Sequence, residues 1–144
     1  MKHYIYKELP SHIKTGIWAS YISAFMLIGI GIFWLVFPLA AEGSFSISPD
    51  TDAAISFAKI VAIFNAICDF LPPIFILLAI RQGQFKLAGQ FHLVTLVLVT
   101  LVDMVVWGAF VPNASAIDVM QHIPFAIPIA IAAYTFLKNP SKNN

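Results

Sequence analysis

The feature that most constrains this chain is its division into four long apolar runs that contain almost no charged residues. The runs cover residues 15–41, 60–80, 87–111 and 119–137. The second and third contain one charge each, Asp69 and Asp103. About 20 apolar residues span a hydrocarbon core about 30 Å thick when they form a helix. We therefore predict an all-α fold: an integral membrane four-helix bundle, with residues 1–144 as a single transmembrane domain.

The composition excludes an ordinary soluble domain. The chain is 60% hydrophobic and 10% charged, whereas an average soluble domain is roughly 45–50% apolar and about 25% charged. The lipid bilayer is thus the expected surroundings, and a net charge of +1 gives no reason to expect a nucleic-acid partner. The first apolar run is far longer than the roughly 7–15-residue core of a signal peptide, so we expect an uncleaved span.

The basic residues indicate the orientation. Seven of the eight fall on one side of a four-span arrangement: Lys2, Lys7, Lys14, Arg81, Lys86, Lys138 and Lys142. Only Lys59 falls on the other side. Because cytoplasmic loops are enriched in Lys and Arg, both termini are expected in the cytoplasm.

The two intramembrane carboxylates are the first candidates for function. A charged group at the bilayer centre costs about 2.5–3.5 kcal/mol on insertion scales, so such residues usually face the protein interior and have partners. At 1.5 Å per residue, Asp69 lies roughly 14 Å and Asp103 roughly 12 Å below the outer edge of the membrane. Since they occur at similar depth on consecutive antiparallel helices, we expect them to face one another.

Other polar residues share these helix faces. Asn65 precedes Asp69 by four residues, Trp107 follows Asp103 by four, and Thr100 precedes Asp103 by three, so each shares a face with its carboxylate. With His122 at the start of the fourth span, the set is expected to converge in the outer half of the bundle. Prolines remove backbone hydrogen bonds from a helix, so Pro72 and Pro73 predict a kink in the second helix, one turn below Asp69.

This set of side chains would suit acid–base chemistry. Two close carboxylates in a low dielectric cannot easily both ionise, which would suit a general acid beside a conjugate base. The candidate catalytic residues are Asp69, Asp103 and His122, with His122 exchanging protons with outer water. Asn65, Thr100 and Trp107 are the candidate ligand-binding residues, and the Trp107 ring could stabilise a carbocation. No cofactor is expected, and four scattered histidines do not predict a metal site.

Simpler interpretations remain open at this stage. The acids, Asn65 and His122 could merely hold the helices together, each hydrogen bond contributing of the order of 0.6 kcal/mol. An ion pathway would also need polar residues through the inner half of the bundle. Ser20, Ser23, Thr95 and a few others occur there, which is weak evidence for a pathway. His92, beside Gln90 near the inner edge, is expected to be an interfacial residue.

Three features of the layout occur together: Pro38 at the end of the first helix before a short acidic loop, the turn RQGQFK at 81–86, and VDMVV at 102–106. In these features the chain resembles the DoxX-like group of small four-span membrane proteins, which includes several families of unknown function. The resemblance implies a four-span fold and no assigned activity. The set of Asp, Asn, Trp and His is also similar, as an analogy of chemistry, to that of sterol-isomerase-type four-span domains.

Three functional hypotheses follow. The leading one is a small multi-pass membrane protein with a polar intramembrane pocket for a hydrophobic small-molecule ligand or a partner. The alternatives are an intramembrane isomerase or cyclase acting on an isoprenoid- or sterol-like substrate, and a structural subunit of a membrane complex. A homo-oligomer or another membrane protein is a possible partner in each case.

Overall fold

The computed structural model describes residues 6–43, 49–111, 115–120 and 122–138, and in these ranges all the regular elements are helices. A short 3₁₀ helix, η1, comes first, and six α-helices follow. Their bounds are η1 Tyr6–Glu8, α1 Ser11–Val36, α2 Pro38–Gly43, α3 Asp52–Arg81, α4 Phe85–Ala109, α5 Ala116–Met120 and α6 Ile123–Leu137. The predicted all-α fold is therefore confirmed for the described part of the chain.

Three of these helices, α1, α3 and α4, are long and apolar enough to cross a membrane. They fit the small integral membrane protein that the uncharged runs predict. The fourth predicted span falls on α5 and α6, and α6 has 15 residues. At 1.5 Å per residue such a helix rises about 22 Å, less than the roughly 30 Å of a hydrocarbon core.

The ends of the helices differ from the ends of the apolar runs. α1 stops at Val36, and Pro38 then begins the short α2. α3 starts at Asp52, well before residue 60, because the Thr51 hydroxyl accepts a hydrogen bond from the Ala54 N–H at 3.2 Å. A capped first turn does not need to be apolar, so the helix extends into the segment expected as a polar loop.

The turn predicted at RQGQFK is confirmed. α3 ends at Arg81 and α4 begins at Phe85. Gly83 has a φ of 70°, in the left-handed region that glycine adopts without steric cost. α3 is helical without interruption through Pro72 and Pro73, and the kink at these prolines stays a prediction.

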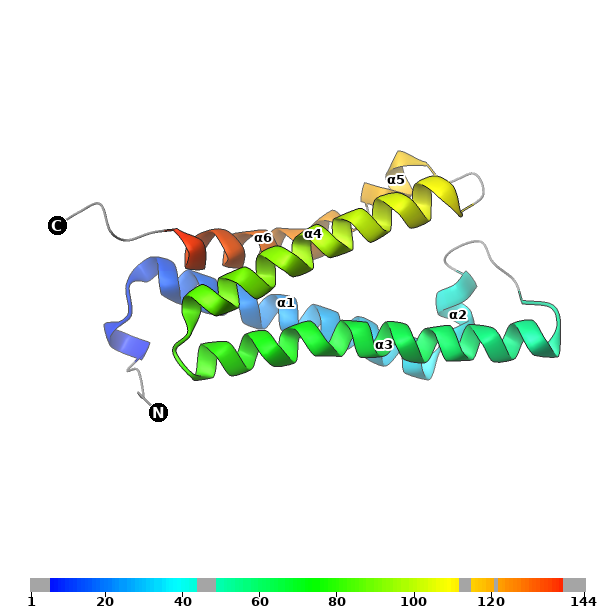
Figure 1. Ribbon diagram of the computed structural model, residues 1–144, viewed down its shortest axis with the longest axis horizontal. Helices are drawn as coiled ribbons and strands as arrows, with labels where there is room; N and C mark the ends of the chain where they lie inside the picture. Colours follow the sequence, from blue (N-terminus) through cyan, green and yellow to red (C-terminus); the bar gives the residue numbers. More distant parts are fainter. Residues whose placement is uncertain (1–5, 44–48, 112–114, 121, 139–144) are drawn as a thin grey trace.

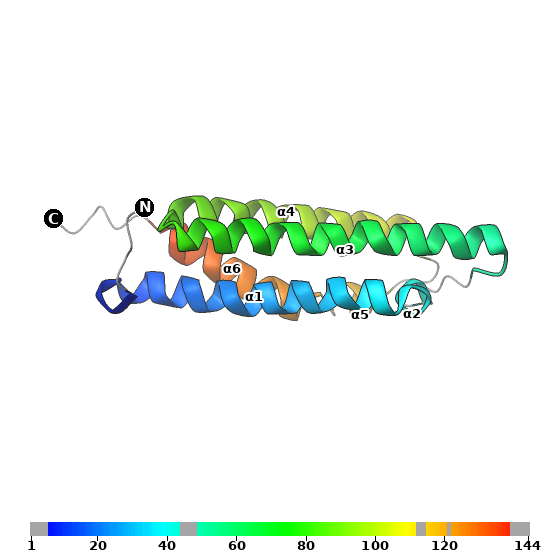
Figure 2. The ribbon, with the colours of Figure 1, turned by 90° about the horizontal axis from the view of Figure 1, so that it is seen from below.

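The four longest helices lie side by side along one direction (Figures 1 and 2). α1 packs against α3 and α6, and α4 packs against α3 and α6. The start of α1, the α3–α4 turn and the end of α6 lie together at one end, which we call the turn end (Figure 1). α2 and α5 lie toward the opposite end, which we call the far end.

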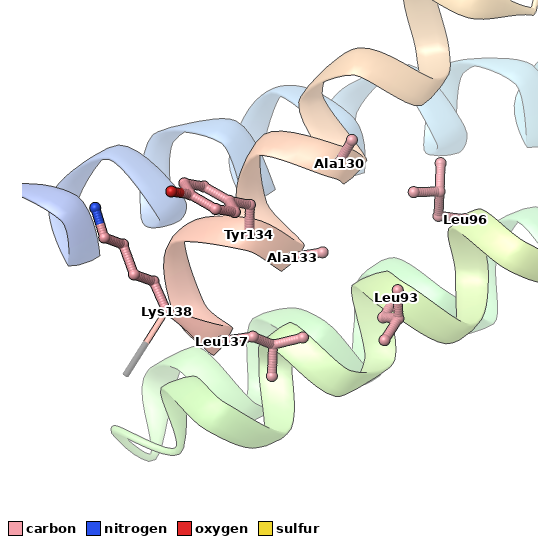
Figure 3. Close-up of a pocket in the computed structure, with 7 residues that line it drawn as sticks. All are labelled: Leu93, Leu96, Ala130, Ala133, Tyr134, Leu137 and Lys138. Carbon is pink, nitrogen blue, oxygen red and sulfur yellow. The ribbon is translucent and has the colours of Figure 1, made fainter. Parts of the chain in front are cut away.

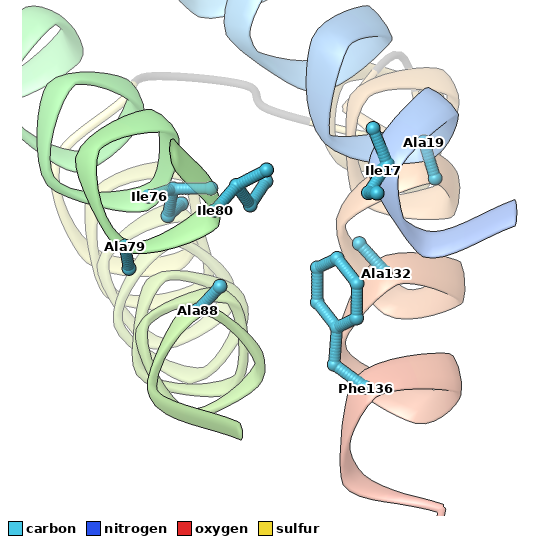
Figure 4. Packing of buried hydrophobic residues seen from close by; sticks show 8 residues of the cluster. All are labelled: Ile17, Ala19, Ile76, Ala79, Ile80, Ala88, Ala132 and Phe136. Carbon is cyan, nitrogen blue, oxygen red and sulfur yellow. The ribbon is translucent and has the colours of Figure 1, made fainter. Parts of the chain in front are cut away.

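The hydrophobic core is concentrated at the turn end, where all four helices contribute to it (Figure 4). Its buried members are Ile17, Ala19, Ile76, Ala79, Ile80, Ala88, Ala132 and Phe136. Toward the far end α4 diverges from α3 (Figure 1). There every described side chain from Val97 to Val105 is exposed, so this half of α4 presents apolar surface on all sides.

Small residues allow the close approach of α1 to its neighbours. A Cβ atom on Gly16 would lie 2.5 Å from Cε1 of Phe136 and 2.6 Å from Oγ1 of Thr135. A Cβ atom on Gly31 would lie 2.6 Å from Cε1 of Phe70. Small residues at such points are typical of membrane helices, because close backbone approach maximises van der Waals contact.

We therefore expect Gly16→Ala to lower the stability of the protein in detergent by about 1–3 kcal/mol, the usual cost of overpacking. The control is Gly29→Ala on the same helix, where an added Cβ has no neighbour within 4 Å. That variant should be neutral, or stabilising by up to about 1 kcal/mol through helix propensity. Thermal unfolding of both variants measures the difference, and equal effects would contradict the packing of α1 against α6.

Candidate functional site

Asp69 lies near the middle of α3, is half-buried, and forms a side-chain hydrogen bond with Trp34 of α1. Tryptophan has only the indole N–H to offer, so Trp34 donates and the carboxylate accepts. Sequence reasoning placed Asp69 opposite Asp103 and missed Trp34. The sequence contained a signal for this pair. The indole of Trp34 can only donate a hydrogen bond and lies on the antiparallel helix that precedes α3, so it is a suitable partner for a carboxylate that must avoid lipid.

The seam between α1 and α3 is tightly built around this pair. Gly31 lies one turn before Trp34 and meets the ring of Phe70, which follows Asp69 directly. Asn65 is half-buried and lies one turn before Asp69. The structure therefore keeps Asn65 and Asp69 on the partly covered side of α3, as their spacing predicts.

Trp107 and His122 form a second pair. Their ring centroids are 5.9 Å apart and the rings meet edge to face, at 81°. Trp107 is 5% exposed although it follows the exposed stretch of α4, and His122 lies at the N-cap of α6. The predicted proximity of these two residues is thus present in the structure.

One further member of the predicted set, Thr100, is not gathered with these pairs. Thr100 is exposed, and its hydroxyl donates to the carbonyl oxygen of Leu96 on its own helix at 2.8 Å. The side chain of Asp103 lies outside the described part of the structure, so its contact with Asp69 stays a prediction. Among the described residues, no three His, Cys, Asp or Glu side chains group closely enough to hold a metal ion.

A third polar pair, Ser20 with His92, lies in the turn-end half and was not expected. Nε2 of His92 is 2.8 Å from Oγ of Ser20, and both residues are 0% exposed. The prediction that His92 is interfacial is wrong, because its ring faces α1 and lies near Phe136, with the centroids 6.4 Å apart. A Ser spaced four residues after a Gly on α1 could have indicated this close helix contact.

The hydrogen bonds of Ser20 indicate which ring nitrogen of His92 carries the proton. The Ser20 hydroxyl has one hydrogen, which it donates to the carbonyl oxygen of Gly16 at 2.7 Å. Nε2–H of His92 must then donate to Ser20, which leaves Nδ1 as the acceptor nitrogen. In the described part of the chain this buried Nδ1 has no hydrogen-bond partner.

The neighbouring hydroxyls do not share this arrangement. Ser23 is also buried, but it donates to the carbonyl oxygen of Ser20 on its own helix at 3.0 Å. Thr95 donates to Phe91 and Thr135 to Ile131, each within one helix and each at 2.8 Å. The Ser20–His92 bond instead joins two helices, α1 and α4.

We expect Ser20→Ala to destabilise the protein by about 1–2 kcal/mol, because it removes a bond between helices and leaves both nitrogens of His92 buried without a partner. Ser23→Ala is the matched control, since it removes a buried hydroxyl that bonds only within α1. Unfolding in detergent, followed by circular dichroism, compares the two. Equal losses of stability in the two variants would mean that the Ser20–His92 bond adds no stability beyond that of a buried hydroxyl bonded within one helix.

Comparison with known proteins was made at the level of families, curated sequences and solved structures. No family model matches the chain, no curated protein matches it, and no solved structure matches it. A function for this chain therefore has to be argued from its own residues and contacts.

Proposed function

We propose that this chain is a small multi-pass membrane protein that holds a polar intramembrane pocket, centred on Asp69, for a hydrophobic ligand or partner. The observation that carries the proposal is the hydrogen bond of Asp69 with Trp34 inside an apolar helix of 30 residues. A carboxylate offers about four acceptor positions, and one indole N–H fills one of them. A hydroxyl or amine on an otherwise apolar molecule would fill another.

Burial supports a site rather than a purely structural contact. Asp69 is half-buried, not enclosed, and Asn65 beside it is half-buried as well. Both lie in the middle part of α3, so a membrane-soluble molecule would reach them from the bilayer without passing through water. Because a charged group costs free energy inside the bilayer, an acidic residue in a membrane span is a functional-site candidate by default.

In the proposed topology, α5 and α6 together form the fourth span of a four-helix bundle, and both termini lie in the cytoplasm. The distribution of basic residues supports this orientation, since Lys14 lies in the first turn of α1, Arg81 and Lys86 flank the α3–α4 turn, and Lys138 follows α6. All these element ends lie at the turn end (Figure 1). The resemblance to the DoxX-like group belongs to the same proposal.

A second candidate is an intramembrane isomerase or cyclase on an isoprenoid- or sterol-like substrate. Asp69 and Asp103 would be its acid and base, and His122 would exchange the proton with outer water. The edge-to-face contact of Trp107 with His122 favours this candidate, because it places an aromatic face beside a titratable ring. The third candidate is a structural subunit of a larger membrane complex. Its association with that complex would not depend on Asp69.

The test of the proposed pocket is Asp69→Asn, with thermal unfolding measured in detergent with and without a lipid extract of the host. Asparagine keeps an oxygen for Trp34 but loses the charge. We expect the variant to unfold like the parent without lipid and to lose the part of the stabilisation by extract that comes from a ligand at Asp69, which is about 2.7 kcal/mol for a ligand at 100 times its Kd. The control is Asp52→Asn, at the exposed first turn of α3.

The outcomes separate the candidates. Lower stability without lipid, together with an undiminished response to extract, would contradict the pocket and favour a purely structural role for Asp69. For the enzyme, mass spectrometry of the extract should show conversion of an apolar component by the parent and none by Asp69→Asn. For a subunit, co-purifying membrane proteins should be the same for parent and variant.

A further inference from the structure

An apolar groove runs between α4 and α6, away from the α1–α3 seam that holds Asp69 (Figure 3). Its volume is about 400 Å³, within the range of small-molecule sites. The residues that matter here are Leu93 and Leu96 of α4, Ala130, Ala133 and Tyr134 of α6, and Lys138. The groove is open on one side.

The middle of the α6 wall has two small side chains, which leave space between α6 and α4. Ala130 and Ala133 face the larger Leu93 and Leu96 across it (Figure 3). A space of this kind in a bilayer does not stay empty, since unfilled apolar walls lose their dispersion contacts. A flexible hydrocarbon chain fills such a space with little steric conflict.

A positive charge lies at one end of this apolar space. Lys138 follows the last turn of α6, and its Nζ lies 5.7 Å from the centroid of the Tyr134 ring. Both residues line the groove and both are exposed. Lys14, Arg81 and Lys86 lie in the first or last turns of α1, α3 and α4 at the same turn end (Figure 1), so basic residues gather at the end of the molecule where Lys138 lies.

We propose that the groove binds one acyl chain of an anionic phospholipid, with the lipid phosphate at Lys138. The lipid has an apolar acyl chain and an anionic phosphate, and the groove has apolar walls and a lysine at one end. The apolar walls take the hydrocarbon chain, and the ammonium group pairs with the phosphate at the depth of the lipid head groups. Basic pockets between membrane helices on the cytoplasmic side are a known way to hold anionic head groups.

The charge balance favours an anionic lipid over a zwitterionic one. Among the described residues at the turn end, Glu8 is the one acidic residue, whereas Asp50 and Asp52 precede or begin α3 at the far end. An added choline cation would therefore meet the like charge of Lys138 and an excess of basic residues at this end of the molecule. Phosphatidylglycerol has no such cation and should bind more tightly than phosphatidylcholine with the same acyl chains.

The experiment titrates the purified full chain in dodecyl maltoside with dioleoyl phosphatidylglycerol and, separately, dioleoyl phosphatidylcholine, and follows the unfolding midpoint. We expect phosphatidylglycerol to raise the midpoint further and at lower concentration. Lys138→Gln should weaken its apparent affinity by about fivefold, the worth of one Lys near an anionic surface. Lys59→Gln, which changes a lysine of α3 near the far end, should leave the affinity unchanged.

The groove itself is tested by filling it. Ala130→Phe should abolish the stabilisation by phosphatidylglycerol, and Leu93→Phe repeats the test from the α4 wall, where the side chain is 44% exposed and the fold tolerates change. Equal responses to the two lipids in the parent would overturn the proposal. So would equal weakening by Lys138→Gln and Lys59→Gln, or an undiminished response in both groove-filling variants.

Discussion

The hydrogen bond between Ser20 and His92 is the interaction on which the arrangement of the turn-end half depends. α1 packs mainly against α3 and α6, so a side chain of α4 that reaches Ser20 must cross the centre of the assembly. In a hydrocarbon environment no water is available to replace a lost partner. This bond therefore links α1 directly to α4, and Phe136 of the buried core lies beside the His92 ring.

The two halves of the molecule use polar groups differently. In the turn-end half, polar atoms are buried among close-packed small and aromatic residues, as at Gly16 beside Phe136. In the far half, α4 diverges and its described side chains from Val97 to Val105 are exposed. Asp69 with Trp34, near the middle of α3, and Trp107 with His122, near the end of α4, lie on separate seams. The turn end is therefore closely packed, and the far half of α4 is more open.

The charge distribution connects this asymmetry with the membrane. Basic residues lie at the ends of elements that meet at the turn end, and the groove with Lys138 opens there. Asp69 and Trp34 lie on other helices, α3 and α1, whereas Trp107 and His122 lie at the far end of α4 and α6. An anionic lipid at Lys138 and a hydrophobic ligand at Asp69 would therefore occupy independent sites, one positioning the protein in the bilayer and the other supporting its function.

The sequence by itself determined the class of protein, the helical content, and the turn at 82–84 between α3 and α4. These properties are local, since they follow from the length of uncharged segments and from the conformational freedom of Gly83. Only the tertiary structure decided that Asp69 bonds to Trp34, that His92 is buried against Ser20, and that Thr100 faces outward. The physical reason is that apolar side chains surround each of these helices on all sides. Their periodicity then defines no buried face, and the rotation of each helix is set by packing at small residues and by the search of each polar group for a partner.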